Sequence, residues 1–212
     1  MKKVLLGCIA SLFVAFGAQA QSGTGIGVKA GLNLPSYSYG SSSDLSDSKS
    51  TTNFFVTAFL DAPVASNLYV QPGVSLQGKG ATLLSTESLG GVEVTQNTMW
   101  LEVPVNLVGK FDLGMGKVAV GAGPYFGVGL SGKNKISGES SGNSIEKDFK
   151  FGSDEMLKRT DFGVNFLVAY ELYNGFTING GYGLGLTNLA GDKALTNDLK
   201  NRVWSIGVGF GI

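Results

Sequence analysis

The sequence predicts an all-β protein: an eight-stranded antiparallel up-and-down transmembrane β-barrel. Three observations predict it. Apolar and polar residues alternate along most of the chain, which is the period of a strand with two different faces. The alternating segments run for about 9 to 14 residues, longer than the roughly 5 to 6 of globular strands and close to the roughly 9 to 11 that cross a bilayer at a tilt. Their connections are alternately long and short, as in outer-membrane barrels.

The first four segments each place bulky apolar residues on one face and small or polar residues on the other. Their apolar faces are Ile26, Val28, Ala30, Leu32 and Leu34 in 25–34; Phe54, Val56, Ala58 and Leu60 in 53–61; Leu68, Val70, Val74 and Leu76 in 67–77; and Met99, Leu101, Val103, Val105 and Leu107 in 98–111.

The last four segments repeat the pattern with more glycine on the second face. Their apolar faces are Val118, Val120, Phe126, Val128 and Leu130 in 117–131; Phe162, Val164, Phe166, Val168, Tyr170 and Leu172 in 160–172; Phe176, Ile178, Tyr182, Leu184 and Leu186 in 176–187; and Trp204, Ile206, Val208, Phe210 and Ile212 in 203–212.

The connections predict which ends of the strands lie together. The long polar ones are 35–52, 78–97, 132–159 and 188–201, and the short ones are 62–66, 112–116 and 173–175. Long connections lie outside the cell and short turns in the periplasm in barrels of this kind. An even number of strands then leaves both termini on the periplasmic side.

Residues 1–20 have the features of a cleaved signal peptide. Lys2 and Lys3 precede an apolar stretch, and Ala18-Gln19-Ala20 is a small-x-small cleavage site. We therefore expect a mature barrel of residues 21–212 in the bacterial outer membrane. It would keep 14 basic and 16 acidic side chains, a balance without a bias toward nucleic acid.

The two faces distinguish a membrane barrel from a soluble, lipocalin-like one. A soluble barrel would turn the bulky apolar face inward. However, the apolar faces carry no Asp, Glu, Lys or Arg, and the opposite faces are mainly Gly, Ser, Thr and Asn. Soluble surfaces are charge-dense, whereas small polar residues suit a narrow lumen. The apolar faces are therefore predicted to contact lipid.

Three prolines fall within predicted strands: Pro72, Pro104 and Pro124. Each removes one hydrogen bond of the ladder, and a closed barrel has no free edge for it. We expect a bulge at each. A bulge would shift the assignment of residues to the two faces, and Trp100 is the residue most sensitive to such a shift.

Several short motifs occur in an order that resembles a known family. They are Gly27-Val28-Lys29-Ala30-Gly31-Leu32-Asn33, Leu101-Glu102-Val103-Pro104-Val105, Gly121-Ala122-Gly123-Pro124-Tyr125, Gly183-Leu184-Gly185-Leu186-Thr187-Asn188 and Asn201-Arg202-Val203-Trp204. Together they resemble the outer-membrane β-barrel domain family that includes PorT-like proteins. The resemblance implies an eight-stranded outer-membrane barrel and permits, without requiring, a role in protein secretion.

The candidate site residues are the polar side chains assigned to the lumen. Reading the strand directions places Asp61, Lys110, Lys117 and Glu171 near the periplasmic mouth, and Lys29, Glu102, Asn106 and Asn165 near mid-height. Both groups are balanced in charge, and unpaired charge in a narrow lumen is costly. We therefore interpret them as a network that fills the lumen, and we predict that Glu102 pairs with Lys29.

The composition excludes some chemistries and leaves several functions open. The chain has no His, which excludes His-dependent catalysis and His-ligated metal, and no cofactor is predicted. The first hypothesis is a non-enzymatic structural or surface-display barrel, in contact with outer-membrane lipid, whose loop 132–159 binds an extracellular or envelope protein. A small-solute or ion pore, a lipid- or peptide-directed enzyme without His and a secretion accessory are the alternatives. The oligomeric state stays open.

Overall fold

The computed structural model describes residues 23–39, 48–86, 92–138, 144–194 and 198–212. The expected signal peptide lies outside these residues. The strands are β1 (Gly25–Tyr39), β2 (Asn53–Ala65), β3 (Leu68–Thr86), β4 (Val92–Leu113), β5 (Gly116–Gly138), β6 (Ser144–Phe149), β7 (Thr160–Leu172), β8 (Phe176–Gly185) and β9 (Leu199–Gly211). No helix among the described residues has the length and apolarity that crossing a bilayer requires.

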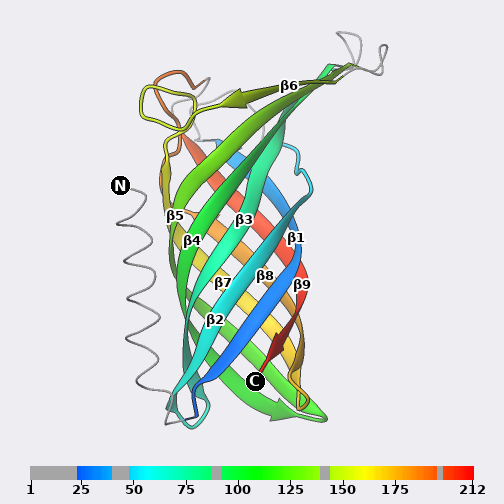
Figure 1. Cartoon of the computed structure of the whole chain (residues 1–212), viewed down its shortest axis with the longest axis vertical. Coiled ribbons are helices and arrows are strands. Elements are labelled where there is room, and N and C mark those ends of the chain that lie inside the picture. The colour runs from blue at the N-terminus through cyan, green and yellow to red at the C-terminus, as the bar shows by residue number, and fades with distance from the viewer. Residues whose placement is uncertain (1–22, 40–47, 87–91, 139–143, 195–197) are drawn as a thin grey trace.

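Eight of these strands close into a barrel. The strands β1 to β5 pair antiparallel in chain order, and β5 then pairs with β7. The pairs β7–β8 and β8–β9 continue the meander. Pairing of β9 with β1, from Gly27↔Gly211 to Tyr39↔Leu199, closes the ring. Figure 1 shows the tilted strands of this barrel. The predicted eight-stranded antiparallel up-and-down barrel is therefore confirmed.

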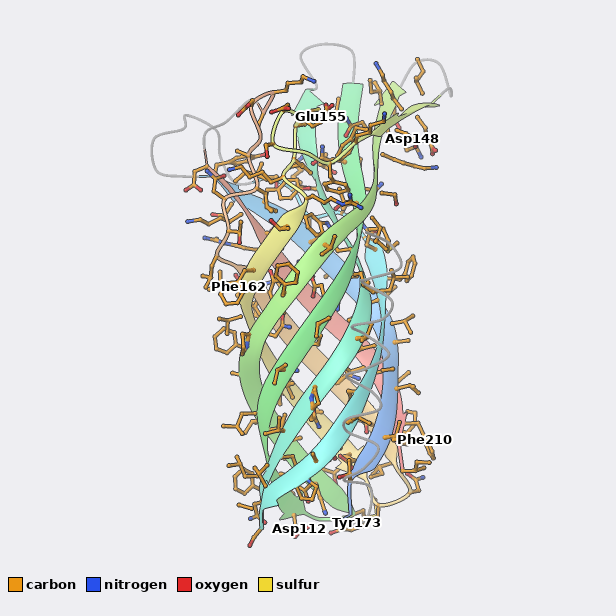
Figure 2. All side chains as sticks on the ribbon, turned by 60° about the vertical axis from the view of Figure 1, so that its left-hand side comes forward. Asp112, Asp148, Glu155, Phe162, Tyr173 and Phe210 are labelled. Atoms are coloured by element: carbon orange, nitrogen blue, oxygen red, sulfur yellow. The ribbon has the colours of Figure 1, made fainter. Side chains whose placement is uncertain are left out.

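The side chains follow the predicted alternation. Val28, Phe166 and Val208 on the outer face are each about half exposed, whereas Gln71, Ser75, Glu102 and Asp161 are buried. Figure 2 shows side chains standing out from the wall, among them Phe162 and Phe210. A closed sheet pairs its backbone polar groups internally, which hydrocarbon requires of a membrane-spanning structure.

The two ends of the barrel differ. At the turn end, short turns join β2 to β3, β4 to β5 and β7 to β8, and β1 begins and β9 ends there. At the loop end, the remaining connections are longer. Figure 2 shows Asp112 and Tyr173 at the turn end and Asp148 and Glu155 beyond the loop end.

The predicted boundaries of all four long loops are wrong because the sheet continues past the barrel. The β3–β4 pairing runs to Thr86↔Val92 and the β4–β5 pairing to Val92↔Gly138, so 78–97 is mostly a hairpin. Within 132–159, residues 132–138 belong to β5 and 144–149 form β6, which pairs with β5 outside the ring. Likewise β1 extends to Tyr39, and β9 begins at Leu199, within the predicted loop 188–201. Beyond the bilayer both faces of a sheet meet water, so apolar and polar residues no longer alternate clearly along the strand.

The predicted bulges at the prolines are also wrong. Pairing of β2 with β3 is interrupted beside Pro72, but it resumes in the same register, and the same holds beside Pro104 and Pro124. A proline removes a backbone hydrogen-bond donor but adds no residue to its strand, so it does not by itself shift the register of the strand pair. The register shifts instead lie at Pro63/Ala65, Thr82/Leu84 and Met99/Trp100.

Trp100 stays on the inner face in spite of the shift beside it. The extra residue lies in β5, because Met99 pairs with Ser131 and Trp100 pairs with Gly129. Trp100 is therefore buried, with 1% of its surface exposed. The shift changes the face of the residues of β5 that follow Leu130, where that strand leaves the barrel.

Candidate functional site

The loop-end ion cluster consists of Lys79, Glu102 and Asp161, supplied by β3, β4 and β7. Lys79 Nζ lies 2.6 Å from Glu102 Oε1 and 2.9 Å from Asp161 Oδ2. All three side chains are at most 3% exposed. Tyr125 OH and Asn201 Nδ2 also donate hydrogen bonds to Asp161 Oδ2, at 3.1 and 2.8 Å. The three donors come from β3, β5 and β9, so they fix this carboxylate of β7 against three other strands.

A glycine makes room for this cluster. Gly163 follows the buried Asp161 on the inner face of β7, and a Cβ there would come within 2.6 Å of the Tyr125 ring. Tyr125 can therefore lie flat against β7 and reach Asp161. Its ring also lies 4.6 Å from Lys79 Nζ, a distance at which a cation and an aromatic face attract.

The predicted pair of Glu102 with Lys29 is wrong, because Glu102 pairs with Lys79. The prediction ended the third strand at residue 77 and left Lys79 in a loop. The lumen positions Gln71, Ser75 and Gln77 alternate, and one further step reaches Lys79. Extending the third strand by two residues would have identified Lys79 as a lumen residue. Asp161 was already assigned to the inner face of its predicted segment.

The turn-end ion cluster consists of Asp61, Lys110 and Glu171. Lys110 Nζ pairs with Asp61 and lies 2.7 Å from Glu171 Oε2, while Gln71 Nε2 donates to Asp61 Oδ1 at 2.9 Å. The structure thus brings together three of the four residues expected at this mouth. Lys117 pairs with Glu171 in backbone register, but no ion pair of its side chain is found in the described part of the chain.

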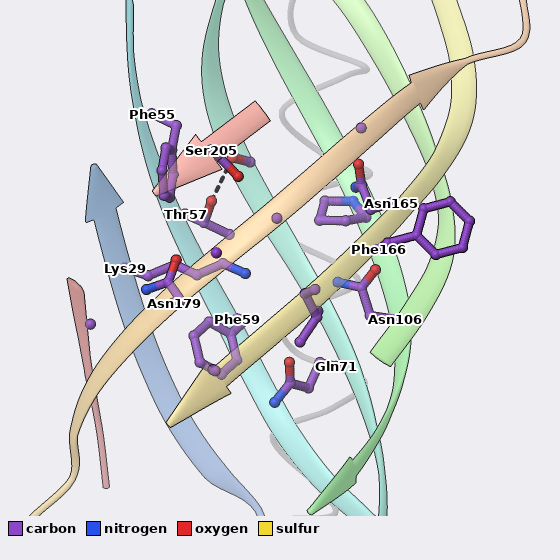
Figure 3. Close-up of a pocket in the computed structure, with 18 of the residues that line it drawn as sticks. Lys29, Phe55, Thr57, Phe59, Gln71, Asn106, Asn165, Phe166, Asn179 and Ser205 are labelled. Atoms are coloured by element: carbon purple, nitrogen blue, oxygen red, sulfur yellow. Dashed lines mark hydrogen bonds between the residues drawn. The ribbon is translucent and has the colours of Figure 1, made fainter. Parts of the chain in front are cut away.

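A cavity of about 110 Å³ lies between the two clusters. Lys29, Asn106, Asn165 and Asn179 line it, and Figure 3 shows their side chains reaching into the same space. On one wall, Thr57 and Ser75 share a 2.6 Å hydrogen bond between their hydroxyl groups. The mid-height residues of the sequence prediction, Glu102 included, therefore line this cavity.

An apolar cap closes the lumen at the loop end. Its buried members are Tyr37, Ala81, Trp100, Leu157, Leu189, Ala190 and Leu199. The rings of Trp100 and Phe151 meet edge to face, with their centroids 5.1 Å apart. A backbone hydrogen bond from Lys158 N to Leu189 O, 2.9 Å long, joins the β6–β7 and β8–β9 connections, and one from Leu189 N to Leu199 O, 2.7 Å long, joins the β8–β9 connection to the start of β9.

Replacing Leu157 by Ala is expected to loosen this cap. The side chain is 2% exposed, and removing a buried leucine costs about 2 to 5 kcal/mol. Trypsin should then cleave faster after Lys158 and Arg159, with the barrel strands still protected. Ile136→Ala, at a side chain that is 42% exposed, should leave cleavage there unchanged. Equal rates in the two variants would contradict the cap.

Nothing in the described residues forms a metal centre, since no group of three or more suitable ligands is found there. The lumen chemistry is that of ion pairs and amides.

Comparison with known proteins identifies the family. The family described as "Outer membrane protein beta-barrel domain" matches residues 18–191, which is most of the chain. The chain belongs to this outer-membrane β-barrel domain family. The protein is therefore a β-barrel of the bacterial outer membrane.

Solved structures with the same kind of fold include other outer-membrane barrels. The attachment invasion locus protein Ail of Yersinia pestis has 14% identity and a TM-score of 0.48, covering 89% of this chain and 98% of its own. Neisserial surface protein A has 11% identity and a TM-score of 0.44, covering 89% and 97%. The N-terminal barrel domain of Pseudomonas aeruginosa OprF has 10% identity and a TM-score of 0.37, covering 89% and 97%. A comparison with curated protein sequences found no match.

Proposed function

We propose that this outer-membrane barrel is a non-enzymatic surface-display protein whose loop end binds a protein partner outside the cell. In this proposal a signal peptide is removed after Ala20, and the turn end with both termini faces the periplasm. The observation that carries the proposal is the contrast between a filled lumen and a sheet that projects beyond the membrane. Mass spectrometry of the mature N-terminus checks the cleavage.

The filled lumen favours display over a pore. Two ion clusters and the apolar cap lie across the path between the ends of the barrel. Eight strands leave room for little more than side chains. Recordings in planar bilayers should show no stepwise conductance, whereas a pore would give it.

The edge of β6 is the surface best suited to a partner. β6 pairs with β5 from Gly132↔Phe149 to Ser137↔Ser144, and in the described part of the chain it ends the sheet. The unpaired backbone groups of an edge strand can pair with an extended peptide. Beside this edge, Ile136 and Ile145 are cross-strand neighbours and are 42% and 66% exposed. We therefore expect an extended segment with apolar side chains.

Charge on β6 adds little to this recognition. Lys133 Nζ lies 3.6 Å from Glu146 Oε2 across the β5–β6 pair, and Lys133 is also the register partner of Asp148. The acidic residues of β6 thus face lysines of its own sheet. Binding should depend on backbone pairing and apolar contact, and it should vary little with salt.

Photo-crosslinking on intact cells tests the proposal. A crosslinking residue in place of Asp148 on β6 should capture a discrete protein, and one in place of Tyr173 at the turn end should not. Capture from position 148 should fall about tenfold or more, or about 1.4 kcal/mol in affinity, when Ile145→Lys is added. Capture that is equal from both positions, or indifferent to Ile145→Lys, would refute the assignment.

A further inference from the structure

The cavity between the ion clusters contains a lysine without a carboxylate partner. Lys29 Nζ lies 5.6 Å from the centroid of the Phe59 ring, and no carboxylate among the described residues forms an ion pair with it. The carboxylates of both clusters are already paired with Lys79 or Lys110. Because a half-buried ammonium without a counter-charge is costly, an acceptor from elsewhere would stabilise Lys29.

A second donor in the cavity points to the same chemistry. Asn179 is 9% exposed, and its Nδ2 group has no hydrogen-bond partner among the described residues. Lys29 and Asn179 lie on β1 and β8, the two strands that pair with β9. Two donors of this kind, both lining one cavity, suit an acceptor-only ligand.

The strand between the two donors leaves room for a ligand. Lys29 pairs with Gly209 and Asn179 pairs with Gly207 in backbone register. A Cβ at Gly209 would come within 3.1 Å of the Lys29 Cβ, and one at Gly207 within 2.9 Å of the Phe55 ring. Phe55 occupies the space at Gly207, whereas Gly209 lines the cavity and adds no side chain to the space beside Lys29.

We propose that the cavity binds a small inorganic anion of the size of chloride, held between Lys29 Nζ and Asn179 Nδ2. A cation would be repelled by Lys29. The volume of about 110 Å³ is well below the roughly 300 to 1,000 Å³ of pockets that hold drug-sized ligands. Asn106 Oδ1, which accepts no hydrogen bond from the described residues, suits a water of the anion's shell. The anion stabilises the barrel independently of any partner at the loop end.

Bromide in place of chloride tests the site. The whole mature chain is refolded from urea into detergent with sodium bromide, so that the anion enters before the lumen closes, and then crystallised. Anomalous scattering should show one bromide in the lumen, within hydrogen-bonding distance of Lys29 Nζ and Asn179 Nδ2. The absence of a lumen peak, or a peak only on the outer surface, would overturn the proposal.

Two variants distinguish this site from an adventitious one. Lys29→Met removes the charge, and Asn179→Asp replaces the donor by a carboxylate that pairs with Lys29. Each should lose the lumen peak. Asn179→Asp keeps the size of the side chain and supplies the missing counter-charge, so it should fold even where Lys29→Met does not. Lys133→Met, on the outside of β5, should keep the peak. Retention of bromide in Asn179→Asp would contradict the proposed contacts.

Discussion

Replacing Lys79 by Met is expected to destabilise the barrel by about 3 to 5 kcal/mol, the usual cost of removing one partner of a buried ion pair. The substitution leaves Glu102 and Asp161, which are 3% and 0% exposed, without their common cation. Both carboxylates would then be buried close together with like charge. Urea-induced unfolding in detergent or liposomes, followed by tryptophan fluorescence, measures the free energy of unfolding.

An exposed ion pair provides the matched control. Lys193 and Glu155 lie 3.2 Å apart with side chains that are 63% and 38% exposed, and Lys193→Met should cost less than about 1 kcal/mol. Adding Glu102→Gln to Lys79→Met should recover part of the loss, because one uncompensated charge disappears. If Lys79→Met were as mild as Lys193→Met, the cluster would not be a major contributor to stability.

Replacing Val208 by Lys is expected to cost about 2 to 4 kcal/mol, the penalty for a cation at the midplane of a membrane barrel. Val208 is the central residue of the outward apolar positions of β9, which begin at Trp204 and end at Ile212. The valine is 50% exposed, and in a bilayer that exposed surface meets acyl chains. Unfolding of the variant in liposomes measures the penalty.

A lysine substitution at an exposed apolar residue outside the barrel is the control, because it removes apolar surface that is not in contact with lipid. Ile145 on β6 is 66% exposed, and Ile145→Lys should change stability by less than about 0.5 kcal/mol. The two substitutions introduce the same charge at exposed apolar positions. Similar costs for both would mean that the outer face of β9 does not lie in hydrocarbon.

The membrane-spanning part of the fold was predictable because lipid and lumen impose opposite demands on alternate residues. Val208 and Gly209 illustrate the demand on β9, where the first faces outward and the second lines the cavity. The same rule does not apply to β6. Its residues from Ile145 to Asp148 are all exposed to water, so their polarity carries no strand period.

The turn-end cluster was predictable from the sequence, but Lys79 and Asp161 of the loop-end cluster were not among the predicted site residues. Asp61, Lys110 and Glu171 meet because strand direction places all three at the same mouth. Lys29 and Glu102 were assigned similar heights, but the tilt and stagger of the strands determine which side chains meet across a lumen. The tilt and the stagger depend on the registers of all the strand pairs around the barrel, so the sequence of a single strand does not determine them.

The prolines give the wall an uneven mechanical character. Pro72 is the register partner of Val105, next to Pro104, and Pro104 is the partner of Tyr125, next to Pro124. The three interruptions of the ladder therefore adjoin one another on β3, β4 and β5 and form a diagonal seam. Along this seam fewer backbone hydrogen bonds hold neighbouring strands against sliding. We therefore expect the barrel to adapt to a thinner or thicker bilayer by deforming here, while the wall formed by β8, β9 and β1 stays rigid.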